Sequence, residues 1–462
     1  MSVLKRVLRV FGWLLLGTVL LLAITVGALL FLNRHDQPPS AQLQALHAAA
    51  KARPTVADAD NAYIYLLGMG VAQGEDPTAA GRARLEWMTS QPPGTPLGPK
   101  PYDESSWRDQ RSEAVKALFE ICRNPDAECS RALMHGDAEL AVWLESEGWL
   151  LERYLALITH TQWRESIPRR GEGFLPYQHA TDGQRLLMAR AWQLGGQGEA
   201  HALTELLQRD LVFWRHALAH SDLLLTKMIA STALRRHFGW GSLAIQRLPS
   251  AAAMAAIPSA WSTALTPEER SMRRSLAGEV LWMEWQVDDA FQLWQSEDHS
   301  ISDSLLQWMA KSLFRRQDTL NRHAILMMQQ AEVLDGPVHE LVSAAARQRT
   351  VAETESWPAL PEAPWYNLAG KMALAISEPA YSDYGLRIAD LEGMRRLALL
   401  SVELHGHRAN ASALPGLLKT SAWQDPYTGK PFTWDSASGE LVFEGLEPGE
   451  RSRYVIPYQP GG

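Results

Sequence analysis

Residues Val10–Leu32 read VFGWLLLGTVLLLAITVGALLFL, and this stretch decides how the rest of the chain is organised. A helix of about 20 apolar residues crosses the roughly 30 Å hydrocarbon core of a bilayer. Lys5, Arg6 and Arg9 precede the stretch, and basic flanks stay on the cytoplasmic side. We therefore expect a single-pass protein of the bacterial inner membrane, with residues 1–9 in the cytoplasm, residues 10–32 in the membrane and the bulk of the chain in the periplasm.

A cleaved signal peptide is the alternative interpretation of this stretch. Its apolar core would span about 7–15 residues and end at small residues. Here the apolar run is longer, and Leu29–Leu32 continues past the small residues Gly27 and Ala28. We therefore expect the helix to remain as an anchor.

The net charge limits the classes of partner. The 462-residue chain carries a net charge of −8, and its first 32 residues hold three basic side chains and no acidic ones, so the remainder sums to −8 − 3 = −11. An acidic ectodomain argues against binding to nucleic acid and to anionic lipid headgroups. A remainder of this length predicts two or three structural units rather than one core.

Tryptophan is unusually frequent, with 18 residues. Most of them lie in apolar helical patterns, as Trp143, Trp192 and Trp214 do, and such patterns predict large core side chains wedged between helices. A platform for carbohydrate or peptidoglycan is the alternative.

Two cysteines, Cys122 and Cys129, flank the sequence RNPDAE. The turn-forming residues between them bring the two thiols together, and the periplasm is oxidising. We therefore predict a structural disulfide. The alternatives are a redox pair or a metal pair, but the spacing fits neither C-x-x-C nor the usual zinc pattern.

Proline-rich stretches divide the part of the chain after the anchor. Residues 33–101 are expected to hold juxtamembrane helices and a connector, QPPGTPLGPKP, at 91–101. Residues 102–414 are expected to form a helical ectodomain. Helices are predicted over residues 42–52, 58–70, 77–89, 107–122, 130–165, 301–315, 318–334, 336–348, 365–376 and 385–404, with irregular stretches at 167–181 and 354–364.

The stretch RLLMARAWQLGGQGEAHALTELLQRDL, residues 185–211, resembles one tetratricopeptide-type unit of two helices joined at Gly195–Gly198. The pattern occurs once, whereas a repeat array needs several copies. We therefore predict a helical pair. Farther on, Thr266-Pro267-Glu268-Glu269 is a capping box with proline in the first turn, and it predicts a helix that runs to about Val287.

After Pro415 the composition changes to aromatic and β-branched runs separated by turn residues. Strands are predicted at 431–434, 440–444 and 453–457, so residues 415–462 should form a small β-hairpin element. The motif DPYTGKP at 425–431, followed by Phe432 and Trp434, resembles the C-terminal hairpin of type II secretion pseudopilins. The chain lacks that family's later calcium-binding acidic residues and its N-terminal pilin helix, so the resemblance implies only a local hairpin shape.

A wider resemblance covers most of the chain. The anchor, LLTKMIA at 224–230, SLAGEV at 275–280, the stretch YNLAGKMALAISEPAYSDYGLRIADLEGMRRL at 366–397 and the DPYTGKPF end resemble a family of bacterial single-pass membrane proteins without an assigned activity. This resemblance implies the same anchored architecture and no particular chemistry.

Candidate catalytic or metal-binding residues are few. His216 and His220 lie one helical turn apart, a spacing that can hold zinc on one face of a helix. Without the glutamate of H-E-x-x-H, solvent-exposed histidines are the favoured interpretation. The sequence contains no phosphate-binding glycine motif and no nucleophile motif, so we predict no bound cofactor.

Two charged residues interrupt apolar helix stripes, Lys227 in LLTKMIA and Glu279 in SLAGEV. Lysine and glutamate are rarely fully buried without a partner. We therefore predict that Glu279 is mostly buried and bonded to a cation, with Lys227, Arg235 and Arg236 as candidate partners. The alternative is that both charged tips reach solvent.

Together these patterns predict a mainly α protein: a transmembrane helix, a multi-helix, partly tetratricopeptide-like ectodomain and a C-terminal β-hairpin. The expected role is an interaction or scaffold protein that contacts another envelope protein in envelope assembly or secretion. The alternative is a metal- or carboxylate-dependent envelope hydrolase, and a secretion-system component is a third possibility.

Overall fold

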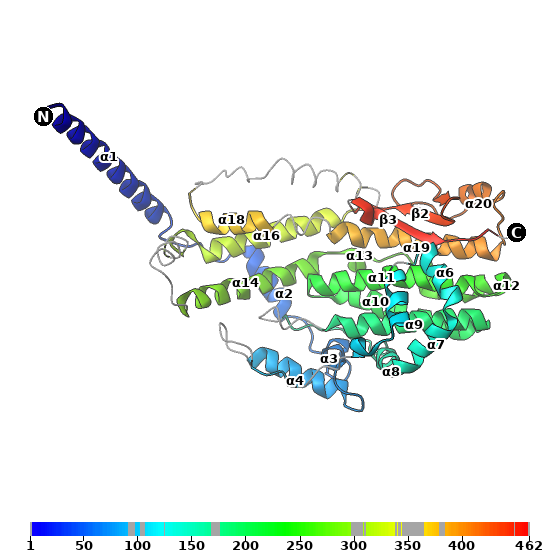
Figure 1. Ribbon diagram of the computed structural model, residues 1–462. Coiled ribbons are helices and arrows are strands. Elements are labelled where there is room, and N and C mark those ends of the chain that lie inside the picture. Colours follow the sequence, from blue (N-terminus) through cyan, green and yellow to red (C-terminus); the bar gives the residue numbers. More distant parts are fainter. Residues whose placement is uncertain are drawn as a thin grey trace.

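The computed structural model is mainly helical, with 69% of residues in helices, which confirms the predicted mainly α character. Figure 1 shows one isolated N-terminal helix that leads into an elongated body of packed helices, with a small sheet in the half of the body remote from that helix. The structure describes residues 2–90, 98–101, 107–123, 125–167, 176–296, 308, 311–337, 340, 343, 365–377, 384–447 and 449–460.

The N-terminal helix, α1 (Ser2–Leu32), contains the apolar stretch. Within it, the 24 residues Arg9–Leu32 are long and apolar enough to cross a membrane. Large apolar side chains such as those of Phe11 and Leu22 are exposed on this helix. An apolar surface of this kind is what a helix presents to lipid.

The body is organised around α11 (Leu224–Gln246). This helix packs against α9 (Tyr177–Gln197), α10 (Ala200–His220) and α19 (Tyr384–Gly406). The predicted helical pair corresponds to α9 and α10, which are joined at Gly198. Its φ of 78° is left-handed, a conformation that glycine adopts without strain, and it lets the chain reverse directly into α10.

One long predicted helix is broken into three. Residues 130–165 were expected to be continuous, but the structure forms α6 (Ala127–His135), α7 (Asp137–Ser146) and α8 (Gly148–Leu157). The first break falls at Gly136, where the backbone leaves the helical region. Glycine in a helix interior costs about 1 kcal/mol relative to alanine, so this position favours a helix end.

The capping box at Thr266 is confirmed. Glu269 N–H donates to Thr266 Oγ1 over 3.2 Å, and Thr266 N–H donates to the Glu269 carboxylate over 2.7 Å. The predicted continuity to Val287 is wrong, because α13 (Pro267–Arg270) is followed by a break. Ser271 is extended with ψ 131°, and its hydroxyl accepts the N–H of the first residue of α14 (Arg273–Ser296). The serine therefore caps a new helix.

Other helices follow the predictions with shifted ends. The predicted 58–70 helix shortens to α3 (Ala62–Gly68), because the Asn61 side chain caps its first turn. The predicted 107–122 helix becomes a 3₁₀ turn, η1 (Trp107–Gln110), and α5 (Glu113–Ile121). The remaining longer helices are α2 (Ala41–Lys51), α4 (Pro77–Ser90), α16 (Arg316–Leu334), α18 (Leu368–Ser377) and α20 (Leu414–Thr420). Most of the predicted helices at 301–315 and 336–348, and most or all of the irregular stretches at 91–101, 167–181 and 354–364, lie outside the described residues.

The C-terminal element is an antiparallel sheet in the order β1 (Thr433–Asp435), β2 (Glu440–Glu444) and β3 (Arg453–Pro457). It packs on α19 and α11 (Figure 1). Phe443 of β2 lies against Gly393 of α19, where a Cβ atom would come within 2.1 Å of the phenyl ring. The glycine therefore allows the sheet to lie directly on the helix.

Candidate functional site

A cavity of about 790 Å³ with several arginines in its lining is bounded by the Cys122–Cys129 loop, α11, α19 and β3. We call it the arginine cavity. It lies in the half of the body remote from α1 (Figure 1). Its charged lining consists of Arg123, Arg235, Arg236, Arg387, Arg453, Asp126 and Glu447. The lining therefore contains five guanidinium groups and two carboxylates, in a chain whose net charge is negative.

The predicted disulfide between Cys122 and Cys129 is present and forms one edge of the cavity. It closes the loop that carries Arg123, Pro125 and Asp126. Pro125 packs against Gly239 of α11, where a Cβ atom would lie 2.2 Å from the proline ring. The bridge therefore holds this edge against the central helix.

Two of the arginines are fixed by a buried carboxylate. Glu447 is 4% exposed, and it pairs with Arg387 at 2.7 Å and with Arg235 at 3.8 Å. The Arg235 guanidinium also lies 5.9 Å from the centre of the Tyr454 ring. Arg235 was one of the three candidate partners predicted for Glu279, but the structure places it with Glu447.

Asp390 of α19 fixes the position of Glu447. It is fully buried and accepts the backbone N–H groups of Leu446 and Glu447 and the hydroxyls of Tyr427 and Tyr454. Burial raises the pKa of the Asp390 carboxyl, and these hydrogen bonds oppose that shift. These bonds fix the turn after β2 to α19. As a result, the Glu447 carboxylate stays beside Arg235 and Arg387.

The other three arginines of the cavity make weaker ionic contacts. Arg236 donates to the neutral Oε1 atom of Gln184 over 2.7 Å, and burial, with repulsion from Arg185, lowers its pKa to about 10. Arg123 and Arg453 are exposed; Arg123 contacts Glu120, and Arg453 lies within 4.0 Å of Asp435 and of the buried Glu440. Guanidinium groups bind carboxylates and phosphates through paired hydrogen bonds. The arrangement therefore suits an anionic group that enters from solvent.

Lys227 is buried, but its partners differ from the predicted ones. The side chain is 2% exposed, and Nζ donates to the carbonyl oxygens of Leu218 at 2.7 Å and Glu269 at 2.9 Å. Burial lowers the pKa of Lys227 to about 7, partly offset by the Glu269 carboxylate. Carbonyl groups at the ends of α10 and α13 therefore bind the ammonium in place of Glu279.

Glu279 also differs from the prediction. It is partly buried, and its carboxylate accepts the backbone N–H of Leu224, the first residue of α11, over 3.1 Å. The N-terminus of a helix carries unpaired N–H groups and partial positive charge, which favour a carboxylate. The expected cation is thus replaced by a helix end.

A second carboxylate, Glu165, caps the same helix. Its Oε2 atom accepts the N–H groups of Asp222 and Leu223, and its Oε1 atom accepts the Thr226 hydroxyl. Burial, together with the nearby Asp222 carboxylate, raises the pKa of Glu165 to about 7. The sequence offered no signal for this role, because Glu165 lies 57 residues before Asp222 and the two meet only in the folded chain.

Glu165 lines a second cavity of about 500 Å³. The Asp222 carboxylate lies near Glu165 and contacts Arg53 and Arg274. One carboxyl group with a raised pKa beside a second carboxylate is an arrangement that a carboxylate-dependent hydrolase could use. Here both oxygens of Glu165 accept hydrogen bonds from the chain, so the carboxylate positions α11. The hydrolase alternative stays a prediction.

Burial raises the pKa of Glu279 from 4.5 to about 7, and the Leu224 amide opposes this shift. Between pH 4.5 and about 7, Glu279 is therefore protonated in the folded state and ionised in the unfolded chain. The free energy of unfolding that comes from this difference is fully present below pH 4.5 and is lost as pH rises through 7. We predict that Glu279→Gln removes up to about 3 kcal/mol of this pH dependence. Urea unfolding at pH 5 and pH 8 measures it, and identical profiles for the variant and the parent would contradict this account of Glu279.

The predicted metal pair lies on α10, where both histidines are half-buried rather than solvent-exposed. The imidazole rings of His216 and His220 stack with centroids 4.1 Å apart, and Nδ1 of His220 lies 2.9 Å from the His216 carbonyl oxygen. Burial lowers the pKa of His216 to about 4. Within the part of the chain that the structure describes, no group of three or more His, Cys, Asp or Glu residues is arranged to hold a metal ion.

Several tryptophans occupy the core, as the helical patterns predicted. Trp214 and Trp261 are at most 1% exposed, and Trp143 and Trp192 are at most 3% exposed. Trp308 and Trp365 are at least half exposed. The described tryptophans therefore serve mainly to pack helices.

The chain matches no protein-family model, no curated protein and no solved structure.

Proposed function

We propose that this protein is a membrane-anchored interaction protein of the bacterial envelope. In this proposal α1 spans the inner membrane, and the helical body lies in the periplasm. The arginine cavity binds an acidic segment of another envelope protein, in envelope assembly or secretion. The observation that carries the proposal is the excess of arginines over acidic side chains in this cavity.

Several features support an interaction role. Lys5, Arg6 and Arg9 before the anchor favour a cytoplasmic N-terminus, and a disulfide suits the oxidising periplasm. Arg236 hydrogen-bonds to a neutral amide, and Arg123 and Arg453 are exposed, so all three can bind an anionic partner while Glu447 stays paired with Arg387 and Arg235. Complementary charge of this kind steers association and selects partners.

Binding of poly-L-glutamate by the full chain in detergent micelles at low salt tests the proposal. We expect saturable binding that is at least tenfold weaker, about 1.4 kcal/mol, in the variant Arg123→Gln/Arg236→Gln/Arg453→Gln. This variant keeps Arg235 and Arg387, which hold Glu447.

A matched control removes three exposed arginines outside the cavity, through Arg190→Gln, Arg209→Gln and Arg273→Gln. The control loses the same net charge and should bind as the parent does. Equal weakening in both triple variants would show that only net charge matters and would contradict a site at the cavity.

A further inference from the structure

The first residue after the membrane helix is bonded to a distant part of the chain. Asn33 is fully buried, and its Nδ2 atom donates to the carbonyl oxygen of Trp365 over 2.9 Å. Its Oδ1 atom accepts the N–H of Asn367 over 2.7 Å. These contacts join the end of α1 to the turn that precedes α18.

Asp36 ties the same junction to α16. Its carboxylate accepts the N–H groups of Gln317 at 2.8 Å and Asp318 at 3.0 Å, in the first turn of that helix. The residue before α16, Arg315, makes no side-chain capping bond. Asn321 adds bonds to the Pro38 carbonyl and the Ser40 amide. The segment after α1 therefore supplies the cap of α16 and does not act as a loose tether.

Asn367 lies at the centre of this junction. It is fully buried, and its φ of 48° is left-handed, which is uncommon for a residue with a side chain. Its amide group donates to Asp318 and Thr319 and accepts the N–H of Arg315. Because both the nitrogen and the oxygen of the amide are hydrogen-bonded, these contacts hold the turn at 365–367 in one orientation.

The length of α1 fixes the depth of this turn. Arg9–Leu32 spans 24 residues. At 1.5 Å per residue it is about 36 Å long, enough to fill the roughly 30 Å hydrocarbon core. With α1 spanning the bilayer as proposed above, Asn33 lies at the boundary between hydrocarbon and headgroups, and the Trp365 backbone, to which Asn33 is bonded, lies at the same level. The Trp365 side chain is 56% exposed, and the Tyr366 hydroxyl donates to the His35 carbonyl.

We propose that the turn 365–367 is seated in the headgroup region of the bilayer leaflet in which α1 ends, so that the body is held against the membrane in a fixed orientation. Tryptophan and tyrosine concentrate in this region, because their rings have an apolar face and a polar edge. The contact uses the aromatic residues and needs no excess of basic side chains, so it is compatible with an acidic body. The occupant of this surface is the lipid bilayer itself.

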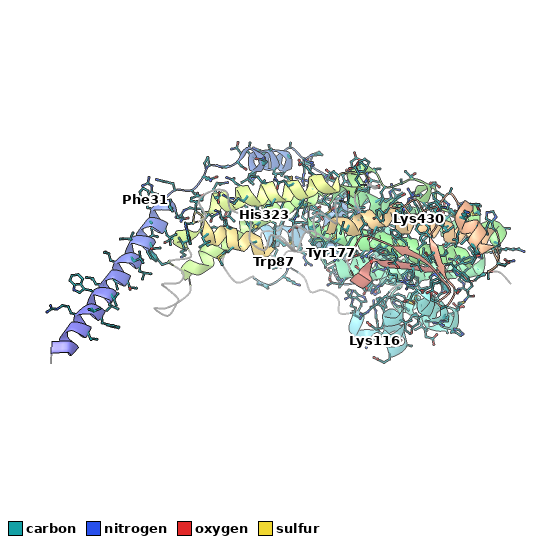
Figure 2. The ribbon with its side chains drawn as sticks, turned by 90° about the horizontal axis from the view of Figure 1, so that it is seen from above. Phe31, Trp87, Lys116, Tyr177, His323 and Lys430 are labelled. Atoms are coloured by element: carbon teal, nitrogen blue, oxygen red, sulfur yellow. A yellow bond between two sulfur atoms is a disulfide. The ribbon has the colours of Figure 1, made fainter. Side chains whose placement is uncertain are left out.

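A spin label attached through Trp365→Cys tests the seat in the full chain, in nanodiscs of phosphatidylethanolamine and phosphatidylglycerol. The native cysteines are joined to each other, so the new thiol is labelled alone. The control label replaces Lys116 on α5, in the part of the body remote from α1, as Figure 2 shows for Lys116 and Phe31. We expect molecular oxygen to relax the label at 365 more than a water-soluble nickel chelate does, and the reverse at 116. A label at 365 with the same preference for nickel as the label at 116 would overturn the proposal.

A second variant tests whether the Asn367 hydrogen bonds, and not only the nearness of α1, hold the turn 365–367 in the headgroup region. Asn367→Gly keeps a residue that tolerates the left-handed backbone and removes the amide that bonds to α16. The oxygen preference at 365 should decrease, while the label at 116 should keep its spectrum and so report an intact body. An undiminished oxygen preference would contradict the role of the Asn367 network. Poly-L-glutamate binding at the arginine cavity should be unchanged, so the two proposals fail independently.

Discussion

Asp210→Ala should cause a large loss of stability. Asp210 is fully buried on α10. Its Oδ1 atom accepts the Tyr154 hydroxyl over 2.5 Å, and its Oδ2 atom accepts from His237 at 2.7 Å and from Gln184 at 3.1 Å. One carboxylate thus joins α8, α9, α10 and α11.

Two tryptophans extend this network and fix the state of His237. Trp261 Nε1 donates to His237 Nε2 over 2.8 Å, and Trp214 Nε1 donates to the Tyr154 hydroxyl over 2.7 Å. An indole N–H only donates, so Nε2 of His237 is an acceptor and Nδ1 carries the proton given to Asp210. The Asp210–His237 pair resembles a catalytic dyad in its chemistry, but Trp261 occupies the nitrogen that a substrate would need.

Removal of the Asp210 carboxylate leaves three buried donors without their acceptor and opens a void. Each unsatisfied buried group costs about 1–3 kcal/mol, so we expect Asp210→Ala to lower the free energy of unfolding by at least about 3 kcal/mol. The midpoint of urea unfolding of the full chain measures this change.

Asp210→Asn is the matched control, because it keeps the side-chain volume and one acceptor oxygen. We expect it to cost about 1–3 kcal/mol, less than the alanine variant. A change of less than about 0.5 kcal/mol in Asp210→Ala would mean that this network does not hold the four helices together.

The fold was predictable where local signals agree. Apolar periodicity identified α1, α9, α10 and α19. The capping box at Thr266 was also predicted correctly, because both of its hydrogen bonds are present. The end of α13 was missed, because it depends on the Ser271 hydroxyl, which favours a new helix start over continuation. Such competition between a helix and a local cap is decided by tertiary packing, which periodicity alone does not report.

The candidate site was less predictable, because its residues come from distant segments. Arg235 and Arg236 stood out beside Lys227, but Arg123, Arg387 and Arg453 carry no local signal and meet only in the folded chain. Lys227 and Glu279 were singled out for interrupting apolar stripes. Their partners are backbone groups at helix ends, which a search for opposite charges does not find.

Loss of charge in the arginine cavity should abolish contact with the partner in cells. A photo-reactive amino acid in place of Thr232, a half-buried residue of α11 that lines the cavity, places the reactive group beside the arginines. An acidic segment held by the guanidinium groups would lie within reach of it. Rim charges act mainly on association, so the crosslink should also weaken as salt rises.

The most direct measurement is this crosslink in cells that express the full chain at its native level, with the adduct peptide read by mass spectrometry. We predict one discrete adduct whose peptide is rich in Asp and Glu. It should be absent when Arg123, Arg236 and Arg453 are changed to Gln and retained when Arg190, Arg209 and Arg273 are changed. An adduct that persists in the cavity variant, or no adduct in the parent chain, would contradict binding of an acidic partner at this cavity.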